Sequence, residues 1–213
     1  MQTPDTATAW EASVQATGTN AQVEARMVAD AANPDGPTGP NLVLKVKTSC
    51  SDCQTGSFPA KQCDCPAGTK IDDSPDTISL SGCLLTCLAM GANVTPCEAN
   101  VTLTDAGDIE SSDGKINDID ESAVDLGMTK DGEDVIYNKS DEAGQATLAA
   151  KLCGHSLAVA NVSKPGASHY VAVTGFKDDG TGKCRFTIDD PRCNNPGQFL
   201  DEYGPTSLVM LYK

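Results

Sequence analysis

Residues 81–92 read SGCLLTCLAMGA, in which a Ser-Gly pair precedes an apolar run. Leucines and alanine recur in this run at helical spacing, so it predicts a helix that begins near Cys83. The free N–H groups and the dipole at a helix N-terminus stabilise a thiolate. Cys83 is therefore the candidate nucleophile, with an ordinary disulfide as the alternative, and Cys87, one turn deeper, is expected to be a small buried side chain.

A thiolate nucleophile needs a base, and the chain contains only two histidines. His169 opens the apolar run 170–176, which a turn-rich segment separates from a second strand pattern over 184–189. In a hairpin centred on the Asp179–Gly180 step, the numbers of opposed residues add up to 359. His169 then lies directly across from Asp190, so an imidazole and a carboxylate point to the same face.

Two other residues compete for these roles. Asp189 points to the opposite face in this register and is expected to be a solvated or structural carboxylate, although a slip of one residue would exchange it with Asp190. His155 follows a predicted helix over 142–153 and precedes the buried strand pattern 157–162. A histidine at such a corner is typically a surface or hinge residue, so we favour His169 as the base.

These segments resemble papain-like cysteine peptidases related to the double-glycine-leader (bacteriocin-processing) peptidases. The resemblance spans roughly residues 60–191 and rests on separated blocks in the same order. The blocks are GCLLTCLAM, GANVTP (91–96), DGKIND with AVDLGM (113–128), GHSLAVANV (154–162), SHYVAVTGF (168–176) and IDDP (188–191). It implies an α+β, papain-like fold in which the nucleophile helix packs on an antiparallel sheet. It also implies Cys83 as nucleophile, His169 as base and Asp190 as the orienting acid.

Such peptidases also stabilise the oxyanion with a glutamine side chain and the N–H of the nucleophile. Gln62 and Asp64 match the family's upstream Gln-x-Asp element, so Gln62 is the candidate oxyanion residue and Gln54 is its alternative. The aromatic residue that usually follows this element is absent from the sequence. A plain surface glutamine is the competing interpretation for both positions.

The ten cysteines indicate an oxidising compartment or metal binding. Cys50, Cys53, Cys63 and Cys65 have a spacing that suits either two disulfides or a structural zinc ion, and we favour disulfides. Cys184 and Cys193 flank the Asp190 turn and are placed to clamp it. If Cys83 is free, nine cysteines remain, so at least one of Cys87, Cys97 and Cys153 must also be unpaired.

The acidic stretch 105–121 resembles a calcium loop around Gly114, but Ile109 then takes the first ligand position. The alternative is a surface loop that leads into an amphipathic helix, with Ile116, Ile119, Ala123 and Leu126 inward and Gly127 as its stop. We favour the loop. The expected site contains no metal and no cofactor.

Composition limits the partners. The chain has 15 basic and 30 acidic residues, a net charge of −15, which disfavours nucleic acid and anionic membranes and favours cationic peptides. No apolar run approaches the roughly 20 residues of a membrane span, and the start lacks the pattern of a signal peptide. We expect a secreted or cell-surface protein, with any export signal outside this sequence.

The domain organisation follows from the change in pattern along the chain. Residues 1–48 hold strand-like runs near 10–16, 23–29 and 42–46, which predict a β-rich extension or partial sandwich module. Residues 49–213 form the expected peptidase domain, which opens with a cysteine-rich segment over 49–75.

Two functions suit this sequence. The favoured one is a secreted thiol hydrolase that cleaves a peptide or peptide-like amide bond through an acyl-enzyme on Cys83. The alternative is a catalytically silent papain-like module for binding or adhesion in a larger surface protein. A transpeptidase would use the same three residues. Substrate specificity and oligomeric state have no signal in the sequence.

Overall fold

The computed structural model describes residues 11–15, 22–26, 53–54, 59–153, 157–164, 167–178, 184–194, 196–204 and 206–213. The chain divides into two compact units, residues 1–51 and 52–213. In the first unit, β1 (Glu11–Gln15) and β2 (Gln22–Arg26) pair as an antiparallel hairpin. These strands coincide with the first two predicted runs, and the third run, 42–46, lies outside the described residues.

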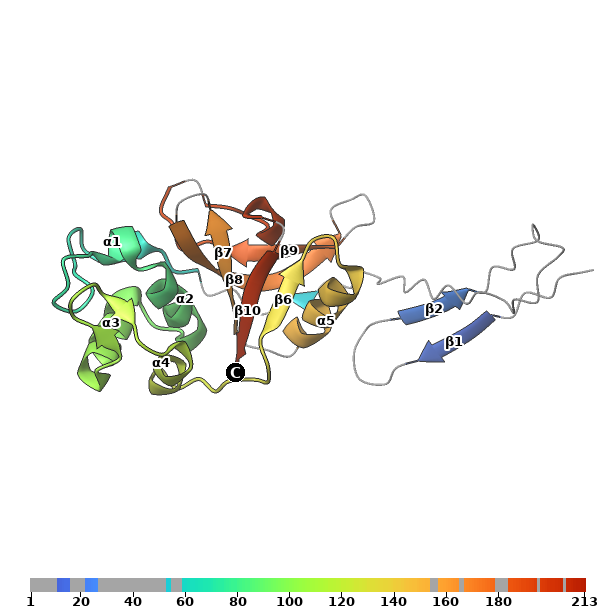
Figure 1. The fold of residues 1–213 in the computed structure, drawn as a ribbon, viewed down its shortest axis with the longest axis horizontal. Coiled ribbons are helices and arrows are strands. Elements are labelled where there is room, and N and C mark those ends of the chain that lie inside the picture. The colour runs from blue at the N-terminus through green and yellow to red at the C-terminus, as the bar shows by residue number, and fades with distance from the viewer. Residues whose placement is uncertain are drawn as a thin grey trace, which may run out of the picture. The chain divides into compact units, whose positions relative to one another are not determined.

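The second unit is α+β, as the sequence predicts. Its main sheet has six antiparallel strands in the order β3-β8-β7-β10-β6, with β9 also paired to β8 (Figure 1). The strands are β3 (Cys53–Gln54), β6 (Val135–Asn138), β7 (Leu157–Lys164), β8 (Ala167–Asp178), β9 (Cys184–Asp189) and β10 (Thr206–Tyr212).

Four of the helices gather on one side of this sheet, and the fifth lies beside β6 (Figure 1). The helices are α1 (Ile78–Ser81), α2 (Cys83–Ala92), α3 (Pro96–Ala106), α4 (Ile119–Asp125) and α5 (Glu142–Leu152), with the short 3-10 turns η1 (Gln62–Asp64) and η2 (Leu200–Glu202). A membrane crossing requires a longer and more apolar helix than any in the described part of the chain.

Helix α2 is the element that joins the helical side to the sheet. It contacts β7 and β8, and its Cys87, Leu88 and Met90 share a buried cluster with sheet residues. A Cβ at Gly91 would lie 2.4 Å from Leu157 Cδ2, so glycine is required where the helix meets β7. The second cluster lies within the helical side, between α1, α2 and α3. The predicted nucleophile helix thus begins at Cys83 and packs on an antiparallel sheet.

The 105–121 stretch contains a second small hairpin in place of the calcium-loop conformation. Its strands are β4 (Ile109–Glu110) and β5 (Lys115–Ile116), and α4 follows with Asp118 as its N-cap. Ala123 is fully buried and Gly127 has φ 84°, as the amphipathic-helix interpretation predicts, but Ile116 belongs to β5 and not to the helix. Among the described residues, no group of three or more His, Cys, Asp or Glu side chains suits a metal ion.

Strands β8 and β9 pair as a hairpin, but the predicted register is wrong. Ala172 lies opposite Asp189, whereas Phe176 lies opposite Phe186, because a bulge interrupts the pairing between Val173 and Gly175. The prediction is off by two residues at Asp189 and by three at Phe186. Its error comes from the turn, since the pairing closes at Asp178–Cys184 and not at the Asp179–Gly180 step.

The bulge decides which aspartate reaches His169. Continuing the pairing that ends at Ala172–Asp189 puts Asp190 opposite Val171, on the same side of the hairpin as His169. If the register near Phe176 continued without a bulge, Asp189 would occupy that side instead. The one extra residue in β8 therefore selects Asp190.

Cysteine pairing differs from the expected pattern. Cys63 is bonded to Cys193 and Cys65 to Cys97. The predicted pairing within the Cys50–Cys65 group is therefore wrong for Cys63 and Cys65, as is a zinc site built on them, because each bonds a distant cysteine. A Cys184–Cys193 clamp is wrong for the same reason.

The prediction that a second cysteine is unpaired when Cys83 is free is confirmed. Cys153 is in a disulfide, whereas Cys83 and Cys87 are free. Cys50 lies outside the described residues. A free Cys83 requires at least one further unpaired cysteine, and Cys87 fills that requirement.

The two bridges should contribute strongly to stability. They close chain segments of 130 and 32 residues, for which loop-closure entropy predicts about 5 and about 4 kcal/mol. We expect Cys63→Ser with Cys193→Ser, and Cys65→Ser with Cys97→Ser, each to lower the free energy of unfolding by several kcal/mol in urea titrations. Cys83→Ser, which removes a free thiol, is the control. Equal stability of all three variants would contradict the structural role of the bridges.

Candidate functional site

Cys83 occupies the first turn of α2 because the chain turns sharply just before it. Helix α1 ends at Ser81, and the N–H of Gly82 donates to the Ile78 carbonyl at 3.0 Å. A Cβ at Gly82 would lie 2.6 Å from that carbonyl oxygen, so only glycine fits this junction. Cys83 is half-buried and its thiol is free, and it is the first residue of α2.

His169 lies on β8 opposite Val162 and is 8% exposed. Its Nε2 is 3.0 Å from Asp190 Oδ1, and the nearby Cys83 side chain is one of the groups that raise its pKa. Because Nε2 faces the carboxylate, Nδ1 is the ring nitrogen left for the thiol. The structure therefore brings together Cys83, His169 and Asp190, although Cys83 and Asp190 are 107 residues apart in the sequence.

The surroundings of His169 favour its protonated form. Burial lowers the pKa of His169, but the hydrogen bonds to Asp190 and Cys83 and the charges of both groups outweigh burial, so the pKa is raised above its ordinary value. An imidazolium at this position would lie between a thiol and a carboxylate. The pair Cys83–His169 is thus arranged for proton transfer from sulfur to nitrogen.

Asp190 is a fully buried carboxylate with an unusually complete set of donors. Its Oδ1 faces His169 and accepts from the Arg192 N–H at 3.0 Å. Its Oδ2 accepts from Arg192 Nη2 at 2.6 Å, from the Gly197 N–H at 2.9 Å and from the Tyr203 hydroxyl. Burial alone would raise the pKa of Asp190, but the bonds to His169, Arg192 and Tyr203 lower it far below the ordinary range.

Sequence reasoning missed Arg192 and Tyr203. The Arg192 N–H bond to the Asp190 side chain is an Asx turn, for which the Asp-Pro-Arg sequence is a recognisable local signal. Tyr203 follows η2, 13 residues after Asp190, and no pattern connects the two. Burial raises the pKa of Tyr203 to about 12, with a further contribution from Asp190, so its hydroxyl remains a neutral donor.

Gln62 lies next to this acid. Its N–H donates to the Pro191 carbonyl at 2.9 Å, and its Nε2 donates to the Ile78 carbonyl at 2.8 Å. It is 3% exposed, so the interpretation as a plain surface glutamine is wrong. One amide hydrogen of Gln62 is therefore used to hold α1.

Gln54, the alternative, belongs to the other end of β8. It pairs with Gly175, six residues from His169, which corresponds to about 20 Å along a strand. Lys61, which precedes Gln62, contacts the site directly, because its Nζ donates to the Asp190 carbonyl at 2.5 Å. Asp64 accepts from the Lys61 N–H at 2.6 Å and so closes η1.

The other residues considered for the site are Cys87, Asp189 and His155. Cys87 is fully buried, as predicted, and burial raises the pKa of its thiol well above the ordinary value. Asp189 is paired with Ala172 within β9, so it does not take the position of Asp190. His155 lies outside the described residues.

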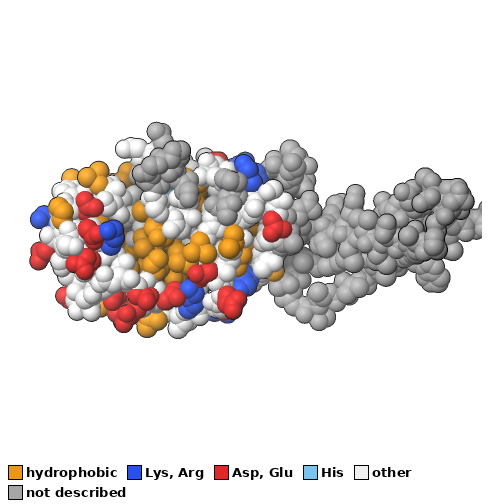
Figure 2. Space-filling model, viewed as in Figure 1, with side chains coloured by type: hydrophobic (Ala, Val, Ile, Leu, Met, Phe, Trp, Pro, Cys, Tyr) orange, Lys and Arg blue, Asp and Glu red, His pale blue; other side chains and the backbone are white. Residues whose placement is uncertain are grey.

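One face of the sheet carries a partly exposed row of side chains. Ile136, Leu208, Asn161 and Tyr170 lie opposite one another across β6, β10, β7 and β8 and so share one face. Ile136 is 65% exposed and Leu208 43%. In Figure 2, hydrophobic side chains gather at the centre of the face shown, and acidic side chains lie along its rim.

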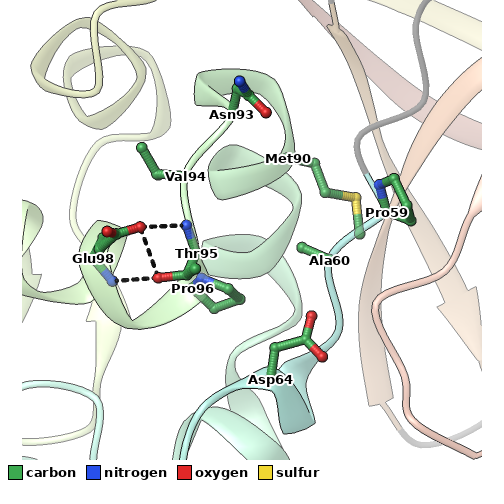
Figure 3. Close-up of a pocket in the computed structure, with 9 residues that line it drawn as sticks. All are labelled: Pro59, Ala60, Asp64, Met90, Asn93, Val94, Thr95, Pro96 and Glu98. Carbon is green, nitrogen blue, oxygen red and sulfur yellow. Dashed lines mark hydrogen bonds between the residues drawn. The ribbon is translucent and has the colours of Figure 1, made fainter.

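A cavity of about 330 Å³ lies at the opposite end of α2 from Cys83. Met90 and Pro59 line one side of it and Val94 lines the other, where Thr95 and Glu98 cap α3 through reciprocal hydrogen bonds (Figure 3). Cys83, His169 and Asp190 are not among its lining residues. The cavity therefore belongs to a separate region of the surface.

The Asp190 carboxylate should make stability depend on pH. Its pKa is lower in the folded state than in the unfolded state, so its contribution is complete above about pH 4 and decreases as the pH falls below that value. Asp190→Asn should lower the free energy of unfolding by about 3 kcal/mol at pH 7, because the buried donors lose their charged acceptor. Urea titrations should show this difference narrowing below about pH 4. Asp105→Asn, at an exposed position on α3, is the control, and a difference independent of pH would contradict the coupling.

A comparison of this chain with family models, curated proteins and solved structures gave no match. The chemistry of the site is therefore judged from its own side chains. They comprise a free thiol at a helix N-terminus, an imidazole whose pKa that thiol raises, and a buried carboxylate that holds the imidazole.

Proposed function

We propose that residues 49–213 are a papain-like cysteine peptidase domain that cleaves a peptide or peptide-like amide bond. One observation carries the proposal: the buried His169 is hydrogen-bonded to Asp190, and the free thiol of Cys83 lies close enough to raise the pKa of the same imidazole. This is the order of nucleophile, base and orienting acid that acyl transfer through a thioester requires. A helix that bears the cysteine and packs on an antiparallel sheet that bears the histidine also supports the papain-like interpretation.

In the first half of the reaction, His169 takes the proton of the Cys83 thiol, and the thiolate attacks the carbonyl carbon of the substrate. The negative charge that develops on the carbonyl oxygen needs donors in place before the reaction. The backbone N–H of Cys83, the first residue of α2, and the second amide hydrogen of Gln62 are the proposed donors. The imidazolium then protonates the leaving amine, and the acyl group remains on sulfur as a thioester.

In the second half, a water molecule replaces the leaving amine. Neutral His169 accepts a proton from this water as it attacks the thioester carbonyl, and the imidazolium returns that proton to the Cys83 sulfur. Asp190 keeps the ring oriented throughout through its 3.0 Å contact with Nε2. If an amine replaces the water, the same intermediate leads to transpeptidation.

The charge of the chain and the exposed side chains of its sheet suggest the kind of substrate. The net charge of −15 favours cationic peptides, and the exposed Ile136 and Leu208 offer an apolar surface to a substrate side chain. The disulfides support a secreted or cell-surface location. Such a domain would act within a larger surface protein or alone on peptides in the same compartment.

Thiol labelling should distinguish this peptidase from the silent binding module. Iodoacetamide should modify Cys83 in the native chain and leave Cys87 unmodified, because Cys83 is half-buried and paired with His169 whereas Cys87 is fully buried with a raised pKa. Mass spectrometry of the digested product identifies the site. His169→Ala should slow the labelling at least tenfold at pH 7. No reaction at Cys83 in the native chain would favour the silent module.

Turnover of a peptide library should depend on the same residues. Cys83→Ala and His169→Ala should abolish cleavage while leaving the far-UV circular dichroism spectrum unchanged, because both side chains act in the chemical steps. Asp190→Ala should retain a small part of the activity, and His155→Ala should cleave as well as the parent chain does. Cleavage that persists in Cys83→Ala would refute the mechanism.

A further inference from the structure

Arg192 makes the most extensive contact with Asp190, and its role is distinct from that of His169. Its Nε lies 2.9 Å from Oδ2 and 3.2 Å from Oδ1, and its Nη2 lies 2.6 Å from Oδ2. The guanidinium thus spans both oxygens of the carboxylate. His169 contacts only Oδ1, so the imidazole and the guanidinium share one negative charge.

The guanidinium is itself held in place. Its Nη2 donates to the Tyr203 hydroxyl, which in turn donates to Asp190 Oδ2, and its central carbon lies 5.3 Å from the centroid of the Tyr203 ring. The ring of Tyr203 is 5.7 Å from that of His169. Arg192, Tyr203 and Asp190 therefore form one connected group behind the imidazole, on the side away from Cys83.

This arrangement has an electrostatic consequence. A carboxylate stabilises a neighbouring imidazolium, but a cation bound to the same carboxylate offsets that stabilisation. We propose that Arg192 is a positioning residue of this site, which orients Asp190 toward His169. Because Arg192 also neutralises that carboxylate, it sets the pH above which His169 loses its proton. For its catalytic meaning this inference rests on the proposed function, whereas the coupling itself concerns only the folded chain.

Several other titratable or charged groups surround the His169–Asp190 pair. They are Cys83 from α2, Asp189 at the end of β9, Arg192, Tyr203 after η2, and Lys61 before η1. Of the two cationic residues in this set, Lys61 contacts the backbone carbonyl of Asp190 and Arg192 contacts its carboxylate. Arg192 is therefore the cation that directly neutralises the acid.

The test is an NMR titration of the His169 ring in the full chain. The chain has only two histidines, so His155→Ala identifies the His169 resonance. We expect Arg192→Gln to raise the pKa of His169 by about one unit, because the Asp190 charge is no longer neutralised.

Arg185→Gln is the matched control. The Arg185 side chain is 29% exposed, close to the 30% of Arg192, and it bonds Asp201 instead of Asp190. It should leave the titration of His169 unchanged. Arg192→Lys keeps the charge but reaches fewer acceptor positions, so its upward shift should be smaller, and it serves as a second test if the glutamine variant does not fold.

The direction of the shift separates this proposal from a merely structural role. Loss of the ordered site would free His169 from Asp190 and move its pKa down toward the ordinary value, whereas the proposed coupling moves it up. An unchanged or lowered pKa in a folded Arg192 variant would overturn the inference, even if the chain cleaves peptides. A raised pKa in a chain that cleaves no peptide would leave the inference standing and count against the peptidase.

Discussion

The buried Asp190 carboxylate is the interaction on which the arrangement of the site depends. Five residues donate to it or to its carbonyl: His169 on β8, Lys61 before η1, Arg192 two residues after it, Gly197, and Tyr203 after η2. A carboxylate without solvent is stable only when it is paired and hydrogen-bonded, so these contacts have to form together. The Cys63–Cys193 bridge holds two of these segments to each other near the same point.

The second constraint is the position of α2. Its N-terminus has to meet His169, and its body has to cover the sheet, because Cys87, Leu88 and Met90 are buried against residues of β7, β8 and β10. Gly82 allows α2 to begin directly after α1, and Gly91 allows it to approach β7. The same helix therefore supplies the thiol at one end and most of the contact between the helical side and the sheet along its length.

Together these constraints explain why the Cys83–His169–Asp190 group is assembled from elements with little in common. The thiol comes from the start of a helix, the imidazole from a strand that a β-bulge interrupts, and the carboxylate from the turn after β9. Local sequence can specify each element, but only their packing sets the distances between the three side chains. The Arg192–Tyr203 pair extends the same group away from Cys83 and links its charge balance to the loop that contains η2.

The sequence by itself determined the elements with strong local signals. The period of the apolar residues and the Ser-Gly start placed α2 and Cys83 correctly, and the apolar run 170–176 and the strand pattern 184–189 predicted β8 and β9, because these signals act within one turn or one strand. Tertiary structure alone decided the register of β8 and β9, the partners of Cys63, Cys65 and Cys193, and the contact of Tyr203 with Asp190. A bulge of one residue, a disulfide across 130 residues and a hydrogen bond across a loop all depend on where distant segments pack, and no local pattern encodes that.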